Sequence, residues 1–234
     1  MSFLREGGSA VQNKLSGNAL KIIAAVTMFI DHMGMLLFPK LLIFRIVGRI
    51  AFPIYAFMIA EGCKYTRNPK KYFAHLAGLA AMCQIVYFLF DGSTFMCVLV
   101  TFSLSFLVLE ALKRLKAAPN VLNAAVFAAA VAGVYALNRV LDIDYGFWGC
   151  MLPVFAGAFH GTRYDDNRIH VLMLGIGMLP LFMTTSSVQI YALMALPLLL
   201  CYSGQRGKWK MKYFFYIFYP VHLVLLQGIC YFVQ

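Results

Sequence analysis

Asp31 and His32 are adjacent ionisable residues inside an apolar stretch that runs from residue 19 to residue 38. If this stretch spans a lipid bilayer, each ionisable group near its centre costs about 2.5–3.5 kcal/mol. Ionisable side chains at that depth usually mark a polar cavity, a proton path or a reaction centre. An imidazole, with an ordinary pKa of about 6.5, suits the work of a general base. His32 and Asp31 are therefore the first candidate catalytic residues.

Lys21 precedes His32 by eleven residues. On an α-helix this separation changes the azimuth by only about 20°, so the two side chains share a face about 16 Å apart. Asp31 points about 100° away from His32, which makes it a poor group for orienting the imidazole. We expect Asp31 to find its partner on a neighbouring helix.

The apolar stretch from residue 43 to residue 62 offers that partner. Arg45 and Arg49 are four residues apart and share a helix face, and we expect one of them to pair with Asp31. This cluster can be a purely structural ion pair, or it can balance the charge of a cavity and bind an acceptor. Glu61 lies at the other end of the stretch, within reach of a basic loop.

The last apolar stretch, 213–232, contains a second candidate histidine, His222. Pro220 removes a backbone donor and frees a carbonyl about one turn upstream, which favours a lined cavity there. We interpret Tyr219 as a cavity residue and Tyr216 as a residue of the membrane interface. His222 is either a hydrogen-bonded packing residue or, like Tyr219, a donor to a developing oxyanion.

Composition sets the class of protein. The chain has 234 residues, 62% of them hydrophobic and 12% charged, which indicates an all-α polytopic membrane bundle. A net charge of +11 suggests nucleic acid, but the basic residues fall in short gaps between apolar runs, and we expect no nucleic-acid partner. The six cysteines lack ligand spacing, so we expect no metal. Nine transmembrane helices are predicted: 19–38, 43–62, 72–90, 95–112, 121–138, 146–161, 168–184, 188–203 and 213–232.

Lys and Arg predict the orientation. The N-terminal segment and alternate gaps carry 16 of the 20 basic residues, which places the N-terminus in the cytoplasm. We expect a cytoplasmic arm over 1–18, which is no signal peptide, and one membrane domain over 19–234. The basic residues Lys21, Lys64, Arg67, Lys70 and Lys71 serve either as this orientation signal alone or as a binding site for the phosphates of a ligand.

Several motifs together resemble the TraX family along nearly the whole chain. The first two matching segments lie in the apolar stretch 19–38, and the others follow along the chain in the order of the family's motifs. The matching segments are Leu20–Ala24, Met28–Gly34, Gly48–Phe57, Glu61–Gly62, Thr66–Asn68, Asp144–Gly146 with Gly149, Phe215–Tyr216 and Tyr219–Leu223.

TraX proteins are associated with N-terminal acetylation of the conjugative pilin. The resemblance implies a transmembrane acetyltransferase that uses acetyl-CoA as acyl donor, with no metal. Related membrane acyltransferases that modify sugars carry an arginine, ten residues and then a catalytic histidine; Lys21 and His32 stand at that spacing, with lysine in place of arginine. The acceptor stays open between a pilin N-terminus, another amine and a sugar hydroxyl.

We expect the arm of acetyl-CoA to thread between helices towards His32, which would deprotonate the acceptor or form an acetyl-histidine. A proton-coupled transporter or flippase could use Asp31, His32 and Arg49 as a relay. No internal repeat is visible to support that alternative. A non-catalytic assembly scaffold is the third possibility, and it predicts that neutral replacements of Asp31 and His32 leave function intact.

Overall fold

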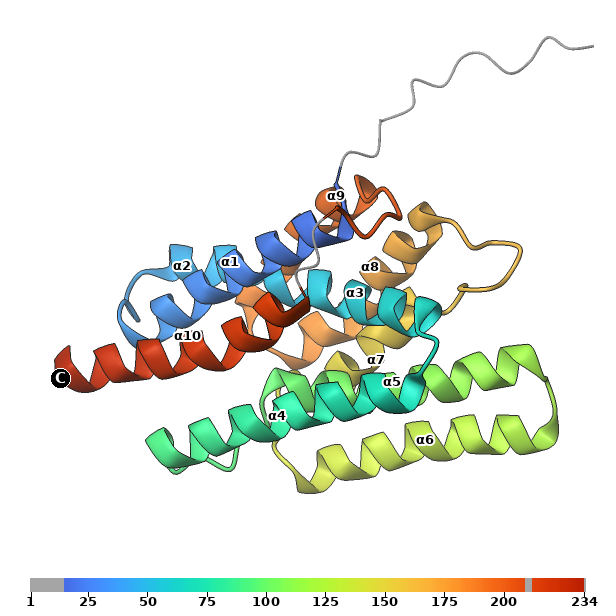
Figure 1. Cartoon of the computed structure of the whole chain (residues 1–234), viewed down its shortest axis with the longest axis horizontal. Helices are drawn as coiled ribbons and strands as arrows, with labels where there is room; N and C mark the ends of the chain where they lie inside the picture. The colour runs from blue at the N-terminus through green and yellow to red at the C-terminus, as the bar shows by residue number, and fades with distance from the viewer. Residues whose placement is uncertain (1–14, 209–211, 234) are drawn as a thin grey trace, which may run out of the picture.

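The computed structural model describes residues 15–208 and 212–233, and its regular elements there are helical (Figure 1). The first half contains α1 (Gly17–Leu36), α2 (Leu42–Gly48), α3 (Ala51–Tyr65), α4 (Pro69–Asp91) and α5 (Val98–Ala117). The second half contains α6 (Val121–Val140), α7 (Gly146–Ala156), α8 (Asn167–Thr184), the 3-10 helix η1 (Ser187–Met194), α9 (Ala195–Leu200) and α10 (Lys212–Val233). The predicted all-α class is confirmed.

Two of the predicted continuous helices are broken, which the sequence reading did not anticipate. The stretch 43–62 forms α2 and α3, which meet around Arg49, and 188–203 forms η1 and α9. Pro53 is the third residue of α3 and Pro197 the third of α9. Proline lacks a backbone N–H and fits the first turn of a helix, so both new helices begin just upstream of a proline.

The N-terminal segment is held to the bundle from residue 15 onward. Ser16 caps α1, its hydroxyl accepting a hydrogen bond from the backbone N–H of Ala19, so the helix begins at Gly17 and not at residue 19. The N–H groups of Gly17 and Asn18 donate to carbonyls of the loop after α9. The predicted arm over 1–18 is therefore partly folded, and residues 1–14 lie outside the described residues.

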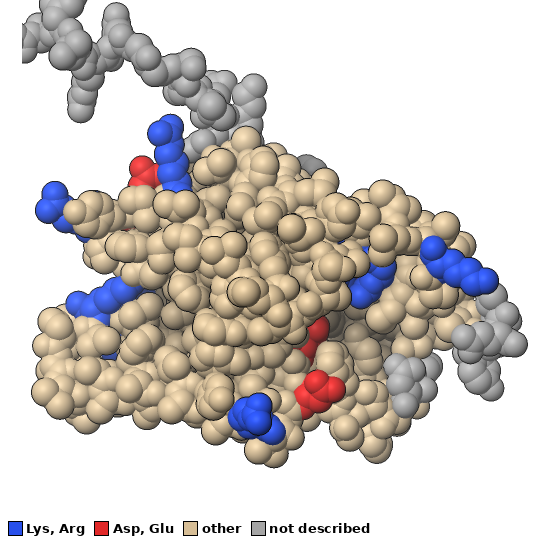
Figure 2. Space-filling view, turned by 180° about the vertical axis from the view of Figure 1, so that it is seen from behind, with Lys and Arg blue, Asp and Glu red and all other residues tan. Residues whose placement is uncertain are grey.

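Helix α3 lies in the centre of the bundle and α6 at its edge (Figure 1). Most side chains of α3 are buried, whereas among the described residues of α6 only Val134 is buried. Five described helical stretches are long and apolar enough to cross a membrane: Gly17–Leu36, Leu42–Tyr65, Pro69–Leu89, Val121–Val140 and Asn167–Thr184. Charged side chains are sparse on the face in Figure 2, as expected for a surface in contact with lipid.

Candidate active site

The side chain of Asp31 lies between two arginines of the broken second segment. Arg49 Nη2 is 2.8 Å and 2.7 Å from the two carboxylate oxygens of Asp31, and Arg45 Nη1 is 2.9 Å from Oδ2. The sequence predicts an ion pair between Asp31 and one of the two arginines, and in the structure Asp31 pairs with both Arg45 and Arg49. Both oxygens of Asp31 accept hydrogen bonds from guanidinium groups, so the carboxylate is fully used in this cluster.

Arg49 is held from the opposite side as well. Its Nη1 is 3.2 Å from Gln189 Oε1 on η1 and 3.4 Å from the hydroxyl of Tyr145. Tyr145 stacks on Phe52 of α3, with ring centroids 3.7 Å apart, and has a φ of 61°, which residues other than glycine rarely adopt. A Cβ at Gly149 would collide with Cβ of Tyr145. The segment Tyr145–Gly149 is therefore shaped to place a hydroxyl beside Arg49.

Gly48 allows the second segment to approach Asp31. A Cβ at this position would overlap the Asp31 side chain, so we expect Gly48→Ala to displace the carboxylate and destabilise the protein by about 1–3 kcal/mol. Unfolding in detergent micelles measures this effect. Gly133→Ala is the matched control, because nothing lies within 4 Å of a Cβ at Gly133. Equal stability of the two variants would contradict the close approach.

His32 does not contact Asp31 through a hydrogen bond; it pairs with His222 of α10. His32 Nδ1 and His222 Nε2 are 3.1 Å apart, and His222 Nδ1 is 2.9 Å from the carbonyl oxygen of Phe218. A carbonyl only accepts, so in the neutral pair His222 Nδ1 carries the proton and Nε2 accepts from His32 Nδ1–H. This arrangement leaves Nε2 of His32 with its lone pair available as a base.

A cavity of about 700 Å³ opens between α1, α3, α4, α5 and α10. Lys21, Lys71 and Arg206 lie in its wall near the ends of the helices that carry most basic residues. The wall also includes the aromatic side chains of Tyr55, Phe102, Phe218 and Tyr219. Neither His32 nor His222 is among the described residues that line this cavity. His222, however, packs directly against Phe218 and Tyr219, which do line it. The imidazole pair therefore lies one layer of side chains away from the cavity.

Glu61 is a buried carboxylate in the wall of this cavity. Its Oε2 accepts a hydrogen bond of 3.2 Å from the hydroxyl of Tyr202, and its Oε1 lies 3.2 Å from His160 Nε2. Burial lowers the pKa of His160, which lies in the turn after α7, although Glu61 opposes this shift. Glu61 thus joins the cavity to a second group of polar residues around His160.

The basic residues predicted to bind a donor lie in different places. Lys21 and Lys71 line the cavity described above. Lys64 does not line that cavity and forms an ion pair of 2.8 Å with Asp165. Arg67 and Lys70 are exposed and lie in the wall of neither cavity described here.

His160, Asp165 and His170 form a compact group that sequence reasoning left without a role. One nitrogen or oxygen of each lies within 4.8 Å of those of the other two, close enough to ligate a metal. Asp165, however, already accepts hydrogen bonds from Lys64, His170 and the backbone of Gly161. Burial raises the pKa of Asp165, but these hydrogen bonds outweigh it and lower the pKa below its ordinary value. Lys64 thus already supplies a cation to this carboxylate.

The long apolar helices and the polar clusters between them define a multi-pass membrane protein with charged groups in its interior. Residues 16–230 match the TraX protein family, and the chain belongs to this family.

A similar curated protein is the "Probable fimbrial assembly protein FimC, serogroup H1" of Dichelobacter nodosus, which is 27% identical over 92% of this chain and 96% of its own length. An uncharacterized protein of Rickettsia prowazekii (strain Madrid E) is 43% identical, over 25% of this chain and 23% of its own. No solved structure matches the chain significantly.

Proposed function

We propose that the protein is a membrane-embedded acetyltransferase that moves an acetyl group from cytoplasmic acetyl-CoA to an amine or hydroxyl acceptor at or across the membrane. The proposal includes nine membrane-crossing segments, a cytoplasmic N-terminus and a place in a bacterial inner membrane. The observation that supports it most is the cavity of about 700 Å³ between the basic helix ends and the His32–His222 pair.

The cavity suits a long polyanion with a slender apolar arm. Its volume lies within the roughly 300–1,000 Å³ of pockets that enclose small-molecule ligands. Lys21, Lys71 and Arg206 supply positive charge at one end for phosphates. Aromatic and aliphatic side chains line the remainder and favour an uncharged chain that ends in a thioester.

His32 would act as the general base. Its free Nε2 takes the proton of the acceptor amine or hydroxyl while the acceptor atom attacks the thioester carbonyl carbon. The bond between carbon and sulfur then breaks, and the proton returns from the imidazolium to the departing thiolate. His222 holds the reactive tautomer, and Phe218 and Tyr219 must move aside for the thioester to reach the imidazole.

The Asp31, Arg45 and Arg49 cluster would hold the cavity's charge balance or bind the acceptor. A proton relay needs a carboxylate whose oxygens are free to accept a proton, and both oxygens of Asp31 already accept hydrogen bonds from guanidinium groups. This contact favours the acetyltransferase over the transporter or flippase. The acceptor would be a protein N-terminus if the fimbrial link in the name of the Dichelobacter nodosus relative extends to this chain.

Binding of the donor tests the cavity directly. We expect the double replacement Lys21→Gln/Arg206→Gln to weaken binding of acetyl-CoA by at least about tenfold, because each lost charge-assisted contact is worth about 1.5–3 kcal/mol. Titration of the purified protein with acetyl-CoA measures the affinity. Lys208→Gln is the control, because Lys208 is an exposed residue of the same loop and does not line the cavity.

Retention of acetyl-CoA on the wild-type protein, seen by mass spectrometry, separates the enzyme from a transporter. Transport of a substrate without acyl turnover and without bound acyl-CoA would overturn the proposal. Unchanged acetyl-CoA affinity in Lys21→Gln/Arg206→Gln would exclude this cavity as the donor site.

A further inference from the structure

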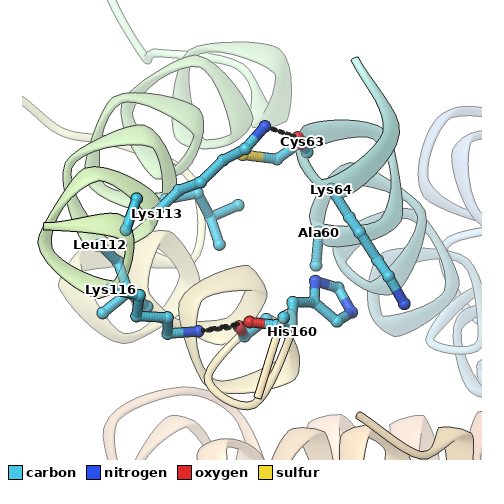
Figure 3. A pocket seen from close by; sticks show the side chains of 11 residues that line it. Ala60, Cys63, Lys64, Leu112, Lys113, Lys116 and His160 are labelled. Atoms are coloured by element: carbon cyan, nitrogen blue, oxygen red, sulfur yellow. Dashed lines mark hydrogen bonds between the residues drawn. The ribbon is translucent and has the colours of Figure 1, made fainter. Parts of the chain in front are cut away.

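A second cavity, of about 240 Å³, lies between the ends of α3, α5 and α7. Figure 3 shows Lys113 and Lys116 of α5 and His160 around a common hollow, whereas Lys64 of α3 lines the hollow but turns its amine away from it. The described residues that line it include these four basic side chains and no Asp or Glu. The cavity is therefore a basic space between helices; Lys64 is already paired with Asp165, so the cavity's remaining positive charge comes from Lys113 and Lys116.

The lysines keep hydrogen-bond donors for a ligand. Lys113 Nζ donates to the carbonyl of Cys63 at 2.9 Å, and Lys116 Nζ to the carbonyls of Gly157 and His160 at 3.0 Å and 3.2 Å. An ammonium has three donors, so each retains at least one.

Within the described part of the chain, these contacts leave the charge of Lys116 without a carboxylate partner and that of Lys113 with a distant one. Among the described residues, Lys116 has no carboxylate within 4.0 Å, and the nearest for Lys113 is Glu110 at 3.8 Å. Carbonyls at helix ends carry only partial charges, so they fix the positions of the ammonium groups without neutralising them.

Size and surroundings indicate the occupant. The cavity is smaller than the roughly 300–1,000 Å³ that enclose a whole small-molecule ligand, so a nucleotide-like donor does not fit. Ala60, Leu109 and Leu112 give it apolar walls next to the basic groups. Basic pockets between membrane helices on the cytoplasmic side bind the headgroups of anionic lipids. We propose that this cavity binds the phosphate group of an anionic lipid of the cytoplasmic leaflet, at a site separate from the acetyl-CoA cavity.

Native mass spectrometry of the purified chain tests this inference. The protein is released from micelles that contain equal amounts of phosphatidylglycerol and phosphatidylcholine with the same acyl chains. We expect the wild type to retain phosphatidylglycerol preferentially, and Lys113→Gln/Lys116→Gln to bind it about tenfold more weakly. Arg114→Gln/Arg168→Gln is the charge-matched control, because both arginines are exposed and line neither cavity.

Equal retention by the wild type and Lys113→Gln/Lys116→Gln would overturn the inference and leave these lysines as helix caps only. Stabilisation of the wild type by inorganic phosphate but not by phosphatidylglycerol would also overturn it, in favour of a soluble phosphate compound. Lys113→Gln alone keeps the test valid if the double variant does not fold, since Lys113 is exposed. Its expected result is a smaller but measurable loss of phosphatidylglycerol. None of these outcomes depends on acetyl transfer, so they are independent of the proposed function.

Discussion

If the protein is the proposed acetyltransferase, His32→Ala is expected to lower acetyl transfer by about 10²–10⁴-fold, because it removes the proposed general base. The assay follows transfer of labelled acetyl groups from acetyl-CoA by the purified protein. His32→Asn sharpens the result, because an amide can still donate to His222 Nε2 but cannot accept a proton at neutral pH. A loss in both variants therefore points to proton transfer and not to the hydrogen bond between the two side chains.

Val26→Ala is the control, because Val26 lies on the same helix, is 52% exposed and, at five and six residues from Asp31 and His32, does not share their helix face. Acetyl-CoA binding should stay within about threefold of wild type in the His32 variants, since the proposed phosphate site at Lys21 and Arg206 does not include His32. Near-normal turnover of His32→Ala would eliminate the mechanism. Loss of donor binding together with turnover would show that His32 supports the cavity and does not act as the base.

The contact between Asp31 and the arginines could be predicted because helix arithmetic and depth both pointed to it. The predicted segments also located the helices, because the boundaries of long apolar runs are visible in the sequence. The break near Arg49 had only a weak signal in Pro53, because proline favours the first turn of a helix but Pro153, Pro180 and Pro220 lie inside unbroken helices. The prediction of one continuous helix over 43–62 gives this proline no weight.

The pairing of His32 with His222 could not be predicted, because it depends on the packing of α10 against α1 across 190 residues. Hydrophobic periodicity predicts which face of a helix is buried, but it does not predict which other helix packs against that face. Gln189 and Tyr145 were missed for the same reason, since both reach Arg49 from distant elements.

The basic residues around the end of α3 show that closeness in sequence does not place side chains in one cavity. Lys64 and Lys71 are close in sequence, but they lie on different helices and line different cavities. The helix end at Tyr65 separates them and turns their side chains in different directions. Asn68 then caps α4 and fixes the start of the helix that carries Lys71. Neighbours in sequence therefore could not be assigned to one binding site.

Asp31→Asn is expected to destabilise the folded protein by about 3–5 kcal/mol, because it leaves the buried guanidinium of Arg49 without its carboxylate. Only 8% of Arg49 is exposed, so water cannot replace the lost partner. Arg45→Gln should cost about 1 kcal/mol or less, because 32% of the Arg45 side chain is exposed. Unfolding by denaturing detergent, followed by circular dichroism, compares the variants.

The double variant Asp31→Asn/Arg49→Gln distinguishes an uncompensated charge from a lost packing contact. Removing both charges takes away the cause of the destabilisation, so the double variant should be more stable than Asp31→Asn alone. If Asp31 also binds the acceptor, this recovered stability will come without recovered acetyl transfer. A double variant that regains turnover would assign the cluster a structural role only, and one less stable than either single variant would contradict the ion-pair explanation.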